Sequence, residues 1–216
     1  QIFFSVIVAL YLLIRYKKNF FKTFYDSGFP GFIAGAFLSI GFAAYVFAMY
    51  TTTVANTNFI ITTETIFLAL LGYFILKEKI KSITLISIIL GMLGVLLILG
   101  SSLSIQTAEQ FVGNLVAFIM PISFAVLVII VRKYPKTDMV PAQFTAGVLA
   151  AFIGLIVAGK LSISFHDLTL AFLAGFFQIG FGFILITIGS QTTPAAVVGV
   201  LMLTESVFGP LWAWLF

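Results

Sequence analysis

The sequence predicts an all-α integral membrane protein, a multi-helix bundle built from two repeats of inverted topology. Three observations carry this prediction. The chain is 62% hydrophobic and only 8% charged, whereas soluble domains carry about 25% charged residues. Its apolar residues gather into long runs. Finally, a glutamate in nearly the same setting occurs twice inside such runs, at Glu64 and at Glu205.

The composition is that of a chain whose side chains face lipid. It contains 26 phenylalanines and its mean hydropathy is +1.22, more apolar surface than one small globular core could bury. The runs approach the length of about 20 residues that a transmembrane helix needs. A transmembrane barrel would instead show runs of about ten residues with alternating polarity. The chain has no cysteine, which excludes disulfides and thiolate metal sites.

Breaks in hydropathy divide the chain into eight apolar segments. They cover residues 2–14, 29–49, 55–76, 83–99, 111–131, 142–158, 168–189 and 194–216. Three prolines stand at segment starts, which helices tolerate, whereas Pro121 lies inside a segment and predicts a local break of the helix.

The charged residues predict the topology. If the segments alternate in direction, three loops on one side hold ten of the 11 Lys and Arg residues: Arg15, Lys17, Lys18, Lys22, Lys77, Lys79, Lys81, Arg132, Lys133 and Lys136. The opposite loops carry only Lys160. The positive-inside rule makes the basic side cytoplasmic, which predicts a multi-pass protein of the cytoplasmic (inner) membrane. The net charge of +4 is thus a topology signal that can also attract lipid headgroups, and we expect no nucleic-acid partner.

The two glutamates belong to a longer internal repeat. Glu64 and Glu205 lie 141 residues apart. The same offset relates Thr63 to Thr204 and Phe67 to Phe208, and it superimposes the sixth segment on the first and the eighth on the third. We expect two repeats, residues 1–100 and 111–216. The first would lack its first helix and the second its last, so these eight segments would belong to a ten-helix protein.

Because each unit would hold five helices, the second unit enters the membrane from the opposite face. Such inverted repeats are common among secondary transporters, whose substrate site lies near the midplane between the repeats. Small residues recur every fourth position in two segments: Gly31, Gly35, Ser39 and Ala43, then Ala146, Ala150, Gly154 and Ala158. Stripes of this kind let helices approach closely in lipid.

Several motifs resemble one family of transporters. The stretch from Tyr50 to Lys79 is similar to the fourth helix of EamA-type permeases of the drug/metabolite transporter superfamily, with Lys77 in place of a usual glycine. The start of the second half, from Gly113 to Lys133, resembles that of the family, and Leu203–Thr204–Glu205 resembles its ninth helix. The resemblance spans essentially the whole chain. It implies ten helices and the export or uptake of small metabolites.

Glu64 and Glu205 are the leading site candidates, because ionisable groups inside the membrane are costly and usually functional. Loss of hydration favours the neutral form of a carboxyl group, so either glutamate can bind and release a proton. The alternative is a protonated glutamate that hydrogen-bonds a neighbouring helix as structural glue. We expect the two to face each other near the midplane.

Polar and aromatic neighbours complete the list of candidates. Thr57 and Thr63 are candidate substrate- or proton-binding residues beside Glu64, and Gln178 lies between Gly175 and Gly180, which could open space beside it. For each, hydrogen bonding within or between helices is an equally good interpretation. Aromatic residues such as Tyr45 could line the site, although aromatic residues usually face lipid or the interface.

The leading hypothesis is a secondary transporter that binds a small molecule, with an amine-bearing or amino-acid-like substrate and with proton coupling. A membrane-embedded enzyme that uses Glu64 and Glu205 as an acid–base pair would need further His, Asp or metal-ligand residues in its helices, and the sequence shows none. A structural assembly partner would have no use for paired midplane glutamates. We expect no metal and no cofactor, and a monomer or homodimer.

The topology can be tested by labelling single cysteines in this cysteine-free chain. A cysteine that replaces Lys79 or Lys133 should react with a membrane-impermeant thiol reagent only from the cytoplasmic side, and one that replaces Thr107 only from outside. Labelling of positions 79 and 107 from the same side would contradict the alternation of segments and, with it, the inverted repeat.

Overall fold

The computed structural model describes residues 1–99, 107–157 and 163–215. Over these residues the chain is helical and contains no β-strand. The elements are α1 (Ile2–Tyr16), η1 (Lys17–Asn19), α2 (Phe20–Thr51), α3 (Val54–Thr62), α4 (Glu64–Leu76), α5 (Ser82–Leu99), α6 (Ala108–Ala117), α7 (Ile119–Lys133), α8 (Val140–Val157), α9 (Phe165–Leu173), η3 (Ala174–Phe181), α10 (Gly182–Ser190) and α11 (Ala195–Leu215).

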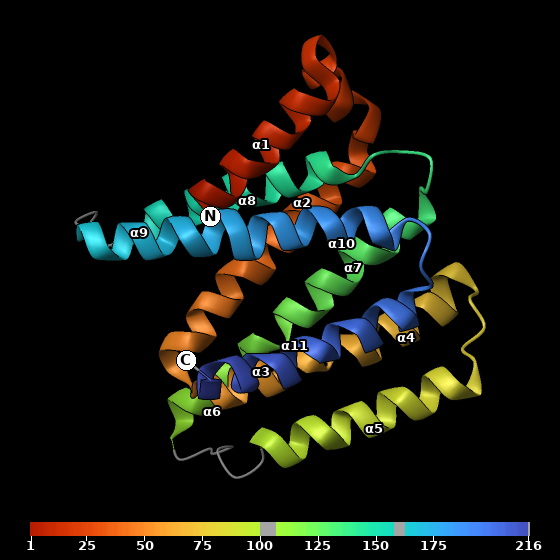
Figure 1. The fold of residues 1–216 in the computed structure, drawn as a ribbon, viewed down its shortest axis with the longest axis vertical. Helices are drawn as coiled ribbons and strands as arrows, with labels where there is room; N and C mark the ends of the chain where they lie inside the picture. The colour runs from red at the N-terminus through yellow and green to blue at the C-terminus, as the bar shows by residue number, and fades with distance from the viewer. Residues whose placement is uncertain (100–106, 158–162, 216) are drawn as a thin grey trace.

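The all-helical membrane fold is confirmed, because every predicted segment is helical in its described residues. Five helical stretches are long and apolar enough to cross a membrane. One of them, Ile2–Thr51, holds the first two segments, and the chain reverses between α1 and α2 (Figure 1). The fourth and eighth segments form the shorter apolar helices Ser82–Leu97 and Ala195–Ser206.

Three segments are less regular than the hydropathy predicted. The second helix begins at Phe20 and breaks at Gly28, whose φ of 54° leaves the helical region. The fifth segment is divided at Phe118 into α6 and α7. Pro121 explains this break, because proline has no N–H for the carbonyl group four residues earlier. The seventh segment contains the π-helical element η3, which the sequence did not predict.

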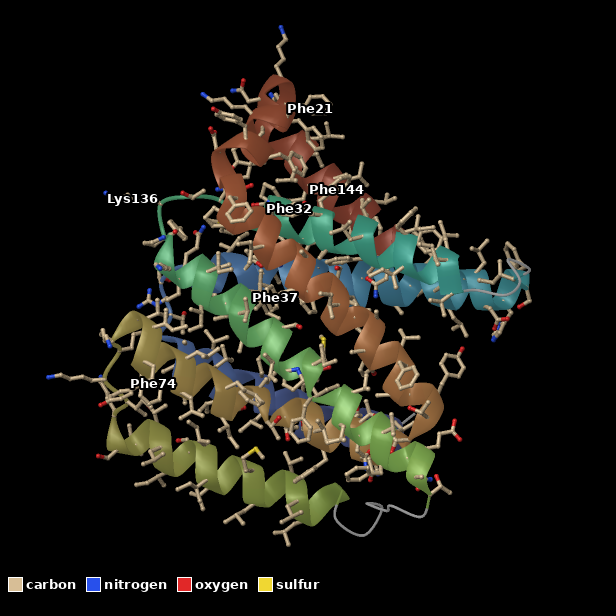
Figure 2. The ribbon with its side chains drawn as sticks, turned by 180° about the vertical axis from the view of Figure 1, so that it is seen from behind. Phe21, Phe32, Phe37, Phe74, Lys136 and Phe144 are labelled. Carbon is tan, nitrogen blue, oxygen red and sulfur yellow. The ribbon has the colours of Figure 1, made fainter. Side chains whose placement is uncertain are left out.

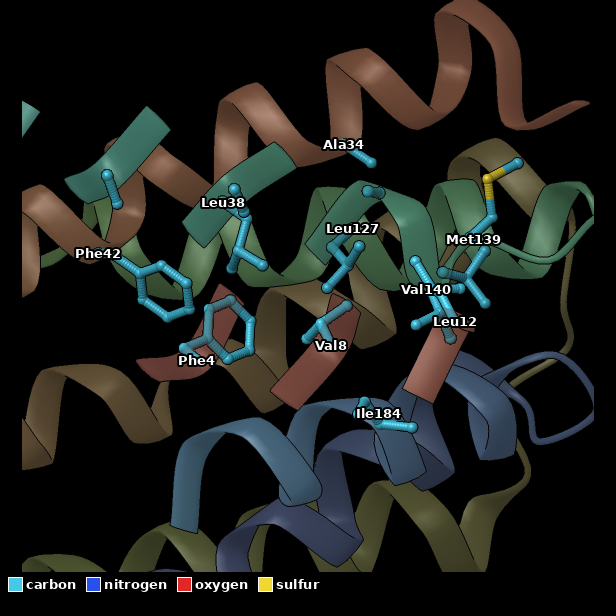
Figure 3. Packing of buried hydrophobic residues seen from close by; sticks show 14 of the residues in the cluster. Phe4, Val8, Leu12, Ala34, Leu38, Phe42, Leu127, Met139, Val140 and Ile184 are labelled. Atoms are coloured by element: carbon cyan, nitrogen blue, oxygen red, sulfur yellow. The ribbon is translucent and has the colours of Figure 1, made fainter. Parts of the chain in front are cut away.

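The helices form two groups that α7 joins. α1, α2, α8 and the run α9–η3–α10 make one group, and α3, α4, α5 and α11 make the other (Figure 1). α7 packs against α2 and α10 on one side and against α4 and α11 on the other. In the first group, Phe4, Leu38, Leu127 and Val140 belong to one buried cluster that draws on α1, α2, α7, α8 and α10 (Figure 3).

The outer surface carries large aromatic side chains, as expected of a surface in contact with lipid. Phe32, Phe37 and Phe74 are 54%, 44% and 62% exposed. They lie on α2 and α4, while Lys136 lies in the loop between α7 and α8 (Figure 2). Exposed aromatic rings in the helices and a cation in the loop fit a protein whose helices are solvated by hydrocarbon.

Helices that the 141-residue offset relates lie side by side and run in opposite directions. α4 packs against α11 and α1 against α8. Ala195, at the start of α11, hydrogen-bonds Glu78, just beyond the end of α4. Likewise Tyr16, at the end of α1, hydrogen-bonds Asp138, just before α8. This antiparallel pairing is the arrangement that an inverted repeat requires.

The pairs meet at glycines. A Cβ atom on Gly199 would lie 2.8 Å from the Cα atom of Thr65, and one on Gly147 would lie 2.3 Å from Oγ of Ser5. Of the predicted stripes, Gly35 packs against the backbone of α8 at Ala142, but Gly154 has no atom of a neighbouring helix within 4 Å. The close packing predicted for α2 is thus confirmed, whereas that of Gly154 is wrong for the described residues.

Gly199 provides a test of the crossing between α4 and α11. We expect Gly199→Ala to lower the free energy of unfolding by about 1–3 kcal/mol, because the added methyl group overlaps the backbone of α4. The matched control is Gly94→Ala in α5, where no other atom lies within 4 Å and alanine should stabilise the helix slightly. Thermal unfolding in detergent measures both variants. Equal stability of Gly199→Ala and the parent would contradict the crossing.

Lys77 provides a second test. It ends α4 in the left-handed conformation, with φ of 58° and ψ of 27°, which glycine adopts without steric cost. We expect Lys77→Gly to stabilise the protein by up to about 1 kcal/mol. Lys79→Gly is the control, because Lys79 does not have a positive φ and the same change there should only add flexibility. A variant at position 77 that is no more stable than its control would count against this conformation.

Candidate functional site

Glu64 begins α4 at a break in an otherwise continuous membrane-spanning helix. Thr63 separates α3 from α4, and its hydroxyl group donates to the carbonyl oxygen of Ile60 at 2.5 Å. Thr204 donates in the same way to Leu201, at 2.6 Å. In both repeats, therefore, the residue directly before the glutamate is a threonine whose hydroxyl group donates a hydrogen bond to a carbonyl oxygen of its own helix.

The structure brings Glu64 and Glu205 near each other. They lie on the offset-related helices α4 and α11, which touch where Thr65 Oγ1 donates to the carbonyl oxygen of Gly199 at 3.1 Å. Their charges are close enough to interact. Glu64 is buried, with 5% of its surface exposed, whereas Glu205 is exposed. The same sequence motif thus lies in two different environments.

Tyr45 of α2 joins this pair, and sequence reasoning named it only as one of several possible lining residues. It is half-buried and close enough to Glu205 for an electrostatic interaction. No motif could have identified Tyr45, because its place depends on how α2 packs across the bundle.

The other predicted residues are placed as follows. Thr57 is fully buried and its hydroxyl group donates to the carbonyl oxygen of Thr53 at 3.1 Å. Thr63 lies directly beside Glu64. Gln178 lies apart from the glutamates, exposed on η3, which packs against α1. Its neighbouring glycines do not open space for it: Gly175 faces Phe3, and a Cβ on Gly180 would meet Ile7 at 2.1 Å.

A buried polar contact in the other group of helices was not predicted from the sequence. Gln143 of α8 is fully buried, and its amide nitrogen donates to the carbonyl oxygen of Phe183 at 2.7 Å and to the hydroxyl group of Thr187. This contact ties α8 to α10. The signal was present in the sequence as an amide side chain near the start of an apolar segment.

The arrangement is suited to a cation or a proton. Within the described residues neither Glu64 nor Glu205 belongs to an ion pair, and no group of three or more His, Cys, Asp or Glu residues could hold a metal ion. Two carboxyl groups near each other without a countercharge repel when both are ionised. A proton or a positively charged group between them would relieve that repulsion.

The sequence model of the EamA-like transporter family matches residues 1–100 and 109–216. The chain is 28% identical over 179 residues to a protein of Rickettsia conorii named S-adenosylmethionine uptake transporter, a match that covers 81% of this chain and 58% of the relative. A relative from Rickettsia bellii with the same name is 27% identical, and covers 81% of this chain and 59% of that protein. An uncharacterized transporter of Clostridium kluyveri is 27% identical, over 74% of this chain and 54% of the relative.

The chain thus spans little more than half the length of these curated relatives. A solved crystal structure superimposes on 97% of the chain with a TM-score of 0.67 and 14% identity, and the match covers 85% of the solved chain. At that identity the likeness supports the fold alone. The family match, by contrast, covers both halves of the sequence. The chain therefore belongs to the EamA-like transporter family, and it is a multi-pass membrane protein.

Proposed function

We propose that this protein is a secondary transporter of the cytoplasmic membrane that moves a small amine-bearing or otherwise cationic metabolite by alternating access. The observation that carries the proposal is the pair Glu64 and Glu205 on two antiparallel, offset-related helices. In inverted-repeat transporters the substrate site lies between the repeats near the midplane. Residues 1–100 and 111–216 are the two units that move against each other in this proposal.

The chemistry of the site supports a cationic substrate. Glu64 and Glu205 provide negative charge, and the aromatic ring of Tyr45 is the kind of group that attracts cations over its face. Relatives bear the name S-adenosylmethionine uptake transporter, and S-adenosylmethionine carries both an amine and a sulfonium cation. That molecule is therefore the first substrate to test, followed by a panel of amino acids and amines.

Proton coupling follows from the same pair. When the substrate leaves, the carboxyl groups lose a countercharge, and a proton from one side of the membrane can take its place. Exchange of a proton for a cation at one shared site couples the two flows without a separate ion site. Thr57 and Thr63 remain candidates for contacts to the substrate, and Gln178 a candidate away from the pair. Monomer or homodimer remains our expectation for the assembly.

Substitution of the glutamates tests the proposal. Glu64→Gln and Glu205→Gln change the charge with little change in shape, so both variants should fold but lose uptake of radiolabelled S-adenosylmethionine into proteoliposomes by at least about tenfold. Any residual uptake by the double variant should no longer vary between about pH 5.5 and 8, because neither amide can titrate there. Glu109→Gln is the control, since Glu109 is exposed at the start of α6.

Thermal stabilisation of the purified protein provides a second readout, since a ligand that binds the folded state raises its stability. The panel of amines identifies the substrate if S-adenosylmethionine has no effect. If both single variants and the double variant transport the parent protein's substrate at the parental rate over that pH range, the glutamates act as structural glue and the proposal is wrong.

A further inference from the structure

Two carboxylates at the basic end of the bundle join the first half of the chain to the second. We call this end, formed by loops 15–22, 77–81 and 132–136, the basic face. Its lysines and arginines follow the positive-inside rule. The structure shows that one of these cations, together with Glu78 and Asp138, also makes specific contacts between helices.

The first contact centres on Glu78, which follows α4. Its Oε1 atom lies 2.7 Å from Nε of Arg132 at the end of α7. Its Oε2 atom accepts the backbone N–H of Ala195 at the start of α11, at 2.8 Å. Arg132 in turn donates through Nη1 to the carbonyl oxygen of Gln191 at 2.8 Å. One carboxylate thus holds together the ends of three helices.

The second contact centres on Asp138, just before α8. The hydroxyl group of Tyr16, at the end of α1, donates to Oδ2 at 2.6 Å. Oδ1 accepts the backbone N–H of Val140 at 2.9 Å. As with Glu78, one oxygen satisfies a free N–H group at the start of a second-half helix, where negative charge is favoured, and the other oxygen holds a second helix.

Beside Glu78, α4 and α11 touch at Gly72 and Ala195, and a cavity lies next to this contact. The cavity of about 100 Å³ lies between α4, α5 and α11, lined by residues that include Gly72, Glu78, Thr84 and Ala196. At the start of α4, Thr65 touches the backbone of Gly199. The cavity leaves room at the basic face for small sliding movements of these helices.

The opposite end is joined by neutral groups in its described residues. Thr52 donates to Oδ1 of Asn114 at 2.6 Å, and Nδ2 of Asn56 donates to the same oxygen at 3.2 Å. Hydrogen bonds that involve an ionised group are roughly twice as strong as neutral ones. The charge-assisted contacts therefore favour closure at the basic face over closure at the opposite end.

We propose that the Glu78 and Asp138 contacts are two clamps that hold the transporter closed at its basic face and that must release before the glutamate pair can open to that side. This inference rests on the alternating access proposed above. In this proposal Glu78 and Asp138 set which side of the resting protein is closed, and Arg132 has a role beyond topology.

A cysteine reporter tests the clamps without any substrate. Ala69→Cys lines the cavity beside Glu78 and is the only thiol, because the chain has no cysteine of its own. In inside-out vesicles, Glu78→Gln or Arg132→Gln should increase the rate of labelling by a membrane-impermeant maleimide about tenfold, since a charge-assisted contact is lost. Tyr16→Phe removes a single hydroxyl group and should give an increase of about threefold. Lys133→Gln, an exposed neighbour of Arg132, should leave labelling unchanged.

A disulfide separates opening of the gate from unfolding. A Cβ on Gly72 would lie 3.1 Å from that of Ala195, near the roughly 3.5–4.5 Å of a disulfide. Gly72→Cys with Ala195→Cys should therefore cross-link on oxidation. In the oxidised protein position 69 is again the only free thiol, and in the Glu78→Gln background its labelling should return to the parental rate.

Two results would overturn this proposal. One is that every clamp variant is labelled at the rate of the Lys133→Gln control. The other is that fast labelling persists in the oxidised protein. Failure of this test and failure of the transport test are distinguishable. Labelling reports movement at the basic face whether or not S-adenosylmethionine is carried, and Glu64→Gln leaves the clamps intact.

Discussion

The fold depends on the close approach of α4 to α11 and of α1 to α8. In hydrocarbon there is no hydrophobic drive to bring helices together, so van der Waals contact and hydrogen bonds between helices must do so. Gly199 and Gly147 permit that contact, because no side chain separates the backbones. Each pair combines one helix from each half of the chain, so the contacts that stabilise the bundle also join its two halves.

Much of the fold could be predicted because its causes are local. The apolar runs are long enough to identify each helix, and the charges lie in loops that the alternation of segments places on one side. The breaks were harder to predict. Pro121 indicated one, since proline cannot continue the hydrogen bonding of a helix. The breaks at Thr63 and within η3 have no comparable residue in the sequence.

The site was predicted less completely, because the rotation of a helix about its axis is not a local property. Gly154 and Gly147 are equally small, yet only Gly147 meets another helix. Tyr45 approaches Glu205 from a helix 160 residues earlier in the chain. Gln178 is exposed on η3, which packs against α1. Contacts between distant residues, such as Glu78 with Arg132, depend on packing that no spacing in the sequence encodes.

The π-helical element η3 makes the surfaces of the two halves of the chain differ. A π-helix closes each hydrogen bond over one residue more than an α-helix does, and η3 spans eight residues in the second half. The stretch 141 residues earlier lies in the regular helix α2. Residues beyond η3 are therefore rotated about the helix axis relative to their counterparts in the first half. Gln178 of η3 stands where the first half has Phe37 of α2, and both residues are exposed on the outside of the bundle, so the two halves of a duplicated sequence present different outer surfaces.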